Sequence, residues 1–473
     1  MTIVSTLVFY PMAQEFAEKF KQESAVKSFD QSHHALMRAS TEKYLATLKK
    51  GTTKFVDLQN SKKKTHLIKW KTLENLDRYL LDFEANFTRR GGKIVWANDA
   101  EEARQEILRI TQQHEAKSVL KATSLVCEEI GLFDYLQKND IDVTETDFGA
   151  FVLELLQEKP YHTVKRTLHL EFEVISKLFH EKFGTPIDAP AEQLATTVRD
   201  LMRSKYLHAE VGVTGADFLL ADTGSIAITE NEGNTRLITS FSKVHIAVAG
   251  IDAVIPSILD LGLFWPLLSS HAFGRPSAVY NSILSGPRQA HETDGPEEMY
   301  VILLDNGRTD LLAEKEQRQG LYCIQCGACS HVCPVYQQIG GHTYKSVYQG
   351  PIGALVAPYI YNKKDFNHLS FASPLSGKPD QVCPVNIKLD KMLLLNRKDA
   401  IERHLVPQTE SRLWKGFAYL MERRRLLDFF GGKTKNFFLR SFFKKFWGKH
   451  RELPSLPQKS FSQQWREQQK KKN

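Results

Sequence analysis

The segment Cys323-Ile-Gln-Cys326-Gly-Ala-Cys329-Ser-His-Val-Cys333-Pro334 determines how the rest of the chain is interpreted. Its four cysteines are separated by two, two and three residues, and a proline closes the run. Loops of this spacing direct three thiolates toward one iron-sulfur cubane, while the fourth cysteine usually serves a different cluster. Zinc sites usually pair two separated Cys-x2-Cys units, and chance groups of buried thiols do not repeat at this spacing. The run therefore predicts an iron-sulfur module.

A second cysteine segment ends in Cys383 and repeats the Cys-Pro-Val ending of the first run. Ser376 and Pro379 occupy the two upstream positions where a Cys-x2-Cys-x3-Cys-Pro motif needs thiols. The remaining thiols make one complete set of four ligands in a crossed pattern: Cys323, Cys326, Cys329 and Cys383. We therefore expect one [4Fe-4S] cluster rather than two, with Cys333 as a left-over ligand. The alternatives are that Cys333 completes the first set and Cys383 is the relic, or that Cys333 and an oxygen of Ser376 hold an incomplete second cluster.

The length and composition indicate a globular protein of two or three domains in a reducing compartment. The chain has 473 residues, of which 42% are hydrophobic, enough for a sizeable core. Five of the six cysteines lie in the two cysteine segments, so the even distribution expected of disulfides is absent. The first ten residues lack the features of a secretory signal, and the apolar stretch 253–268 is interrupted by two prolines and an aspartate. These observations predict a cytoplasmic protein.

Basic residues are concentrated at the C-terminal end of the chain. The net charge is +8, but residues 411–473 hold 17 Lys and Arg against four Asp and Glu, which leaves the first 410 residues at −5. The segment interleaves large apolar residues with basic ones: Trp414, Phe417, Leu420, Phe429, Phe430, Phe437, Phe438, Phe442, Phe443, Phe446 and Trp447, with Arg423, Arg424, Arg425, Arg440, Lys444, Lys445 and Lys449. This mixture is typical of a helix that packs on a partner protein or on the chain's own iron-sulfur module, with a peripheral membrane contact as another option. Nucleic-acid binding is not expected, because the rest of the chain offers no basic groove.

Alternating strand and helix patterns before the cysteine run predict an α/β domain with a mostly parallel sheet. The expected strands are 93–97, 118–122, 141–144, 226–229, 244–249 and 300–304, and the expected helices include 128–138 and residues 150–205. Residues 1–65 are predicted to be helical and polar, without chemistry of their own; they either pack within the protein or cover a partner. The predicted division is a helical segment at 1–65, the α/β domain at 66–312, an α-helical iron-sulfur module at 313–400 and a basic tail at 401–473.

Glycine-rich loops at strand ends are the candidate ligand site of the α/β domain. In open α/β sheets the ligand crevice lies at the carboxyl ends of the strands, where backbone amides approach an anion. Glu230, Glu232 and Asp222 lie near such turns and are candidate bases or nucleophiles, although tight turns without any ligand are an equal alternative. Cys127, at a strand-to-helix junction, is expected to be a packing residue. No G-x-G-x-x-G or G-x4-G-K-[ST] motif is present, so neither a flavin nor NAD is expected on this chain.

Several segments together carry a resemblance to a known family: 121–131, 145–149, 213–218, 232–234, 243–247, 294–298, the cysteine run with 340–344, and 453–457. On these segments the chain resembles the lactate utilisation protein B family, the iron-sulfur subunit of a bacterial lactate-utilisation system. The resemblance covers nearly the whole chain.

The resemblance implies an α/β domain similar in fold to ribose-5-phosphate isomerase and CoA transferases, followed by an α-helical ferredoxin module. It implies an electron carrier in a complex that oxidises L-lactate to pyruvate with two other subunits, one cysteine-rich and one a relative of this α/β domain. It also implies two [4Fe-4S] clusters, a pattern from which this chain departs at Ser376 and Pro379.

We therefore expect an electron-transfer subunit of cytoplasmic lactate oxidation, in which the α/β domain binds a partner or a small anion. A single cluster passes one electron at a time, so a two-electron acceptor is expected on another subunit or on a diffusing carrier. The alternatives are a catalytic α/β domain of the isomerase or CoA-transferase type with a structural cluster, and an assembly scaffold without redox function.

Overall fold

The computed structural model describes residues 10–406, 408–423, 431–443 and 452–472, and it describes only the backbone of residues 10–14, 408–410, 442, 443 and 472. The chain divides into two compact units, one ending at Asp399 and the other beginning at Ala400. The α/β part and the cysteine segments therefore belong to the same unit. The finer boundaries expected near residues 65 and 312 stay predictions.

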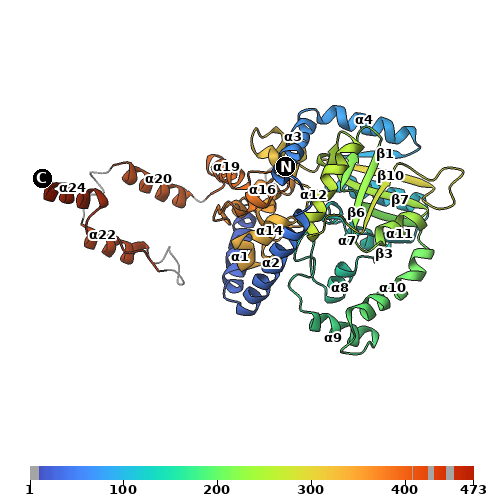
Figure 1. Ribbon diagram of the computed structural model, residues 1–473, viewed down its shortest axis with the longest axis horizontal. Helices are drawn as coiled ribbons and strands as arrows, with labels where there is room; N and C mark the ends of the chain where they lie inside the picture. The colour runs from blue at the N-terminus through green and yellow to red at the C-terminus, as the bar shows by residue number, and fades with distance from the viewer. Residues whose placement is uncertain (1–9, 407, 424–430, 444–451, 473) are drawn as a thin grey trace, which may run out of the picture. The chain divides into compact units, whose positions relative to one another are not determined.

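Six parallel strands form the main sheet of the first unit (Figure 1). Their order is β1-β10-β7-β4-β2-β3, with β1 (Lys93–Ala97), β2 (Ser118–Lys121), β3 (Asp142–Glu145), β4 (Val211–Gly215), β7 (Val244–Gly250) and β10 (Glu298–Leu304). All five neighbouring pairs are parallel, with Val301 of β10 beside Ala247 of β7 at the centre. The expected mostly parallel sheet is confirmed.

Successive residues of the central strands face two different cores. Ile246 and Ile302 pack on one face with α5 (Ala100–Gln113), α6 (Leu125–Glu129) and α7 (Leu132–Lys138). Ala247 and Val301 face the opposite core, which also contains α4 (Leu76–Arg89), α12 (Leu261–Phe273) and the cysteines. A parallel strand buried on both faces needs a nearly continuous apolar run, and these strands have one. The helix expected over 128–138 is interrupted at Gly131, whose φ of 60° is left-handed.

A second sheet was not expected from the sequence. It has four strands in the order β8-β5-β6-β9: β5 (Phe218–Leu220), β6 (Ser225–Glu230), β8 (Val254–Ile255) and β9 (Tyr280–Leu284). β6 is antiparallel to β5 and β9, whereas β5 and β8 are parallel. The predicted strand 226–229 therefore belongs to this mixed sheet and not to the parallel one. The short turns η1 (Ile251–Ala253) and η2 (Ile258–Asp260) and the helices α11 (Asn234–Phe241) and α13 (Arg308–Ala313) complete the α/β part.

The prediction that residues 150–205 are helical is wrong for residues 157–171 and 184–190. Three helices cover the region, α8 (Phe148–Leu156), α9 (Phe172–Phe183) and α10 (Ala191–Leu207). Residues 157–171, which we call the connecting segment, contain no helix or strand. α8 ends because Gln157 takes a left-handed conformation, with φ of 56°.

The N-terminal region is helical, as expected, over the residues that the structure describes. It forms α1 (Tyr10–Lys27), α2 (Gln31–Thr52) and α3 (Leu58–Glu74). Asp30 and Asp57 cap α2 and α3 by accepting hydrogen bonds from backbone amides of the first turn. α2 packs against α12 and α15, and α3 packs against α12 and β8, so these helices contact both the α/β part and the cysteine module.

The cysteine module is built from short helices, which confirms its expected helical character. They are η3 (Gln317–Tyr322), α14 (Ala328–Val332), α15 (Pro334–Ile339), η4 (His342–Tyr344), α16 (Gly350–Ile360), α17 (Lys363–Phe366), η5 (Asn367–Phe371), α18 (Lys378–Val382) and α19 (Leu389–Glu402).

A buried ionic network joins the cysteine module to the α/β part. Arg308 of α13 contacts Glu129 of α6 at 2.8 Å and Asp252 at 2.7 Å, and only 3% of its side chain is exposed. Tyr348 of the module donates a hydrogen bond of 2.6 Å to the same Glu129. Since all the charges are paired and hydrogen-bonded, the network can be tolerated in the interior.

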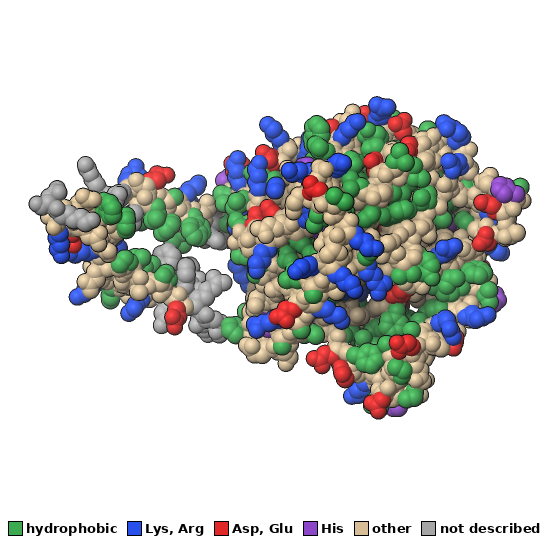
Figure 2. Space-filling model, viewed as in Figure 1, with side chains coloured by type: hydrophobic (Ala, Val, Ile, Leu, Met, Phe, Trp, Pro, Cys, Tyr) green, Lys and Arg blue, Asp and Glu red, His purple; other side chains and the backbone are tan. Residues whose placement is uncertain are grey.

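The second unit contains the basic tail. Its described helices are α20 (Gln408–Glu422), α22 (Gly432–Phe438) and α24 (Phe461–Lys472), with a π-helical turn, η6 (Leu439–Phe443), after α22. Figure 2 shows apolar and basic side chains next to each other on this unit. The exposed apolar side chains include Leu413, Trp414, Phe417, Leu420, Phe437 and Phe438. The remaining predicted tail positions lie outside the described residues or have only a described backbone: Arg424, Arg425, Phe429, Phe430, Phe442, Phe443, Lys444, Lys445, Phe446, Trp447 and Lys449. Across the described part of the chain, no helix has the length and apolar character needed to span a bilayer.

Candidate functional site

The structure brings four of the five clustered cysteines together around one small cavity. Cys323, Cys326, Cys329 and Cys383 line a space of about 30 Å³, together with apolar side chains such as Leu125, Ile352 and Ile387. Cys323 and Cys326 come from the loop between η3 and α14, Cys329 lies in α14, and Cys383 follows α18. α14 and α18 pack directly on each other, which places the two cysteine segments side by side.

The donors and the surroundings of this cavity fit a [4Fe-4S] cluster. Four thiolates are the usual ligand set, and backbone N–H groups that point at sulfur are a common part of the protein's contribution. The amide of Gln325 lies 3.3 Å from Cys323 Sγ, and the amide of Ile387 lies 3.4 Å from Cys383 Sγ. Burial raises the pKa of all four thiols, that of Cys329 to about 12, so the metal-free cysteines stay protonated and bind iron only with release of protons.

Cys333 lies outside this cavity. It is buried at the start of α15, where the backbone amides of Val335 and Tyr336 point at its sulfur. Ser376 is exposed, and Pro379 offers no ligand atom on its side chain. Cys127 is a fully buried free thiol within the core of the main sheet.

Helix α3 holds the turn that carries Cys383. Lys62 donates hydrogen bonds to the carbonyl oxygens of Gln381 and Val382, at 3.0 and 3.3 Å. Thr65 Oγ1 donates to the carbonyl of Pro384 at 3.1 Å, and His66 Nδ1 lies 3.0 Å from the carbonyl of Val385. Two backbone carbonyls before Cys383 and two after it therefore contact side chains of a single helix, which no sequence pattern connects with the cysteines.

Lys62 is also a buried cation beside the thiols. Only 3% of its surface is exposed. Burial lowers the pKa of Lys62, while the thiolates of Cys383 and Cys326 act in the opposite direction. A lysine that is buried beside bound thiolates therefore keeps its charge more readily than one without them.

A larger pocket adjoins the cysteine cavity at the carboxyl ends of the strands. Its volume is about 250 Å³, and it is lined by the residues that follow β2, β4 and β6 and by the connecting segment. Leu125, Thr163, Ile324 and Gln325 line both this pocket, which we call the strand-end pocket, and the cysteine cavity. The two spaces therefore share part of their walls, and part of that shared wall is the cysteine loop itself.

Arg166 supplies a buried positive charge to the strand-end pocket. Its side chain is 3% exposed and pairs with Glu128 through Nη1. Its Nη2 is buried and has no hydrogen-bond partner among the described residues. An unpaired guanidinium N–H that lines a pocket is suited to one oxygen of a carboxylate or phosphate.

The three acidic candidates from the sequence have different surroundings. Glu230 accepts hydrogen bonds from the amides of Thr235 and Arg236 at 2.8 and 2.9 Å, so it caps α11. Asp222 lies outside the strand-end pocket and accepts from Ser257 and Ile258. Glu232 lines the pocket, and burial raises its pKa to about 7. Of the three, Glu232 alone combines access to the pocket with a pKa near neutrality.

Comparisons with known proteins place these features in a family. The LUD domain matches residues 80–304, and a 4Fe-4S dicluster domain matches residues 319–387. A protein named lactate utilization protein B from Geobacillus thermodenitrificans is 39% identical over 348 residues, 73% of each chain. The chain belongs to the lactate utilisation protein B family. Another protein of that name, from a Geobacillus species, is 36% identical over 416 residues, 85% of this chain and 87% of its own.

The similarity extends beyond proteins that bear the name of the lactate utilisation protein B family. An Escherichia coli protein called an uncharacterized electron transport protein, YkgF, is 40% identical over 347 residues, 73% of each chain. A crystal structure of a DUF162 family protein from Deinococcus radiodurans matches 48% of this chain and 98% of that chain, with 14% identity and a TM-score of 0.29.

Several residues of this site were not predicted from the sequence. Thr163 and Arg166 lie on the connecting segment, which has an unremarkable polar sequence and was expected to be helical. Lys62 and Thr65 lie on a helix more than 250 residues before the cysteines. No local pattern links them to the site, because only the tertiary fold makes them neighbours.

Proposed function

We propose that the chain is the electron-transfer iron-sulfur subunit of a cytoplasmic system that oxidises L-lactate to pyruvate. Cys323, Cys326, Cys329 and Cys383 would hold one [4Fe-4S] cluster. When bound, this group supplies one-electron transfer. The names of the relatives support a role in lactate utilisation and electron transport. The single cluster is supported by the thiol supply, since a second set of ligands would need Ser376 and Pro379.

The observation that carries the proposal is the wall shared by the strand-end pocket and the cysteine cavity. Arg166 would bind the carboxylate of a small anion, and Ile324 and Gln325 would separate that anion from the cysteines. The cysteine-rich and LUD-type subunits expected from the resemblance would supply the two-electron chemistry, because nothing in the sequence predicts a flavin or nicotinamide site on this chain.

The test begins with iron and acid-labile sulfide in anaerobically purified protein, which we expect to be about four of each per chain. Cys383→Ala should strip or convert the cluster, whereas Cys333→Ala should keep it. About eight irons per chain would contradict the single cluster, and loss of the cluster only in Cys333→Ala would contradict the ligand assignment.

The second step tests the role in the cell. A strain without the gene should stop consuming L-lactate, and the wild-type gene should restore consumption while the Cys383→Ala gene should not. Consumption at the parental rate in the deleted strain would contradict the proposed function.

Glu232 favours a second candidate function, a catalytic α/β domain of the isomerase or CoA-transferase type. A carboxylate with a pKa of about 7 in a pocket suits a general base. The two functions give opposite results in the same two variants. Catalysis in the pocket requires an isomerase or CoA-transferase activity that survives Cys383→Ala and disappears in Glu232→Gln. Electron transfer requires loss of dithionite-dependent bleaching in Cys383→Ala and its retention in Glu232→Gln.

A further inference from the structure

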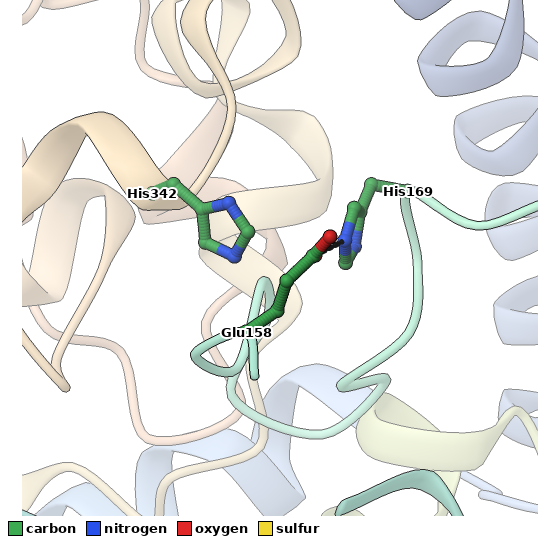
Figure 3. A group of neighbouring side chains, drawn as sticks. All are labelled: Glu158, His169 and His342. Atoms are coloured by element: carbon green, nitrogen blue, oxygen red, sulfur yellow. Dashed lines mark hydrogen bonds and ion pairs between the residues drawn. The ribbon is translucent and has the colours of Figure 1, made fainter. Parts of the chain in front are cut away.

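Three metal-ligating side chains meet at a place that is separate from the cysteines (Figure 3). Glu158 and His169 belong to the connecting segment, and His342 belongs to η4 of the cysteine module. One possible ligand atom from each residue lies within 4.8 Å of the other two. In Figure 3 the carboxylate of Glu158 projects between the two imidazole rings.

The two histidines are held in place from outside the group. The ring of Tyr161 stacks on His169 with centroids 4.4 Å apart and meets His342 edge-on at 4.8 Å. His342 Nε2 lies 2.7 Å from the carbonyl oxygen of Lys159. Packing of this kind restricts the rings without using all of their nitrogens, as metal sites require.

The hydrogen bonds within the group leave nitrogen atoms free. His169 Nε2 lies 2.6 Å from Glu158 Oε2. The other nitrogen of that ring, Nδ1, is buried and has no hydrogen-bond partner in the described part of the chain. Glu158 is therefore the ring's hydrogen-bond partner among the described residues, and a cation bound between Nε2 and Glu158 would replace that contact without breaking another hydrogen bond of the ring.

The group faces a cavity of about 700 Å³. Glu158, His169 and His342 all line it, and so do His33 and Asp30 from the start of α2. An ion held by the three side chains would therefore have at least one coordination position directed toward open space. A catalytic or exchangeable metal site has this form, whereas a structural zinc site is closed by four protein ligands.

We propose that Glu158, His169 and His342 bind a divalent transition-metal ion, with a coordination position open to the cavity. Two imidazoles and one carboxylate suit Zn²⁺ and Fe²⁺, since neither Ca²⁺ nor Mg²⁺ prefers nitrogen ligands. Glu158 and His169 are eleven positions apart, and His342 lies on the other side of the cysteine run. The fold alone assembles this set.

The site would tie the connecting segment to the cysteine module. His162, which follows Tyr161 in the sequence, contacts the cysteine segment. Its Nε2 lies 3.3 Å from the carbonyl oxygen of Gly327, and the centroids of the His162 and His331 rings are 4.2 Å apart. A bound ion would thus fix a segment that also supplies Thr163 and Arg166 to the strand-end pocket. Metal binding at this site can be measured without lactate or any partner, so its test is independent of the function proposed above.

The experiment is equilibrium dialysis of cluster-loaded protein against micromolar Zn²⁺, with zinc and iron measured in the same samples. We expect one zinc per chain that depends on the three side chains. Loss of a direct ligand should weaken binding by about tenfold or more, because loss of an outer partner of a ligand already costs that much. Glu158→Gln, His169→Ala and His342→Ala should each show this loss at unchanged iron content.

His208→Ala is the matched control, because His208 is an exposed histidine at the end of α10. It should leave zinc binding unchanged. Thermal unfolding gives a second readout: zinc should raise the midpoint of wild-type protein and of His208→Ala but not that of Glu158→Gln, since a ligand of the native state stabilises it by mass action. Equal zinc contents in wild-type protein and the three variants at equal iron would overturn the site, and so would wild-type protein that retains no zinc.

Discussion

At the scale of single residues, Lys62 shows how one buried charge can set the properties of the cysteine site. It is the buried member of a run of three lysines, whereas Lys63 and Lys64 are exposed. A positive charge close to the thiolates stabilises the reduced form of a cluster, which carries one more negative charge. The residue is thus placed to affect both the geometry of the Cys383 turn and the ease of reduction.

Replacing Lys62 by methionine should lower the reduction potential of the cluster. Removal of the charge makes the reduced state less favourable, and we expect a shift on the order of 50 mV, which corresponds to roughly 1 kcal/mol for one electron. Potentiometric titration followed by electron paramagnetic resonance measures the effect. Lys63→Met is the control and should leave the potential unchanged; equal potentials in the two variants would show that Lys62 has no electrostatic role.

Glu232 predicts that anion binding in the strand-end pocket depends on pH. Its pKa of about 7, raised by burial, makes it neutral at pH 6 and ionised at pH 8. Ionisation adds a negative charge to the pocket, so an anion should bind more weakly as pH rises, by on the order of tenfold. Calorimetric titration with L-lactate at both pH values tests this. In Glu232→Gln the affinity should depend less on pH, with the remainder due to Asp217, which lines the same pocket and has its pKa raised to about 6 by burial; an unchanged dependence would contradict the role of Glu232.

At the scale of elements, α3 acts as a support for the Cys383 turn through side chains at residues 62, 65 and 66. Each of these side chains bonds to a backbone carbonyl, so the interaction depends on the backbone conformation of the turn and not on the turn's side chains. Buried carbonyls that lose their donors carry a desolvation cost, which links the helix to the stability of the fourth cysteine.

Thr65→Val should make the cluster more labile without removing any ligand. The substitution keeps the shape of the side chain but removes the donor to the Pro384 carbonyl, at a cost of about 1–3 kcal/mol. We expect faster loss of visible absorption when the protein is exposed to air. Thr72→Val is a close control on the same helix, since Thr72 is equally buried but its hydroxyl donates to Ile68 of its own helix. Equal decay rates in the two variants would contradict a supporting role.

The helices and strands that could be predicted from the sequence are those whose hydrophobic pattern and flanking turn residues lie within the element itself. Strands of the main sheet are continuous apolar runs between turn residues, and most of them were found within two residues of their bounds. β4, β5, β8 and β9 were not among the expected strands; β5 and β8, with three and two residues, are too short to show a period. The connecting segment was missed because its polar residues are compatible with a helix, and its contacts with the cysteine module override that propensity. The cysteine set was suggested by spacing, whereas Lys62, Arg166 and His169 gave no local signal.

At the scale of the whole molecule, the ionic network around Arg308 explains why the α/β part and the cysteine module form one unit. Arg308→Met would leave Glu129 and Asp252 without their cation in the interior, and we expect destabilisation of about 3–5 kcal/mol. Chemical denaturation at fixed pH measures it. Arg288→Met removes an exposed pair with Glu297, with side chains 40% and 57% exposed, and should cost less than about 1 kcal/mol. Similar losses in both variants would show that the buried network adds little.

The tail gives a prediction about assembly. The apolar face of α20, with Trp414, Phe417 and Leu420 exposed, is suited to a partner protein or a membrane surface. A chain truncated after Val406 should therefore lose co-purification with the partner subunits proposed above, partitioning to anionic vesicles, or both. If the truncated and full-length proteins behave alike in both assays, neither surface role holds.

The support given by α3 has a consequence for the order in which the protein matures. Translation produces α3 first, and the turn it binds follows about three hundred residues later, with the Thr65 and Pro384 partners 319 positions apart. Cys323, Cys326 and Cys329 are therefore synthesised before Cys383 can be positioned beside them. Iron delivered at that stage would find only three of the four ligands. We expect iron loading to follow the binding of the Cys383 turn to α3, because only then are all four thiols in place.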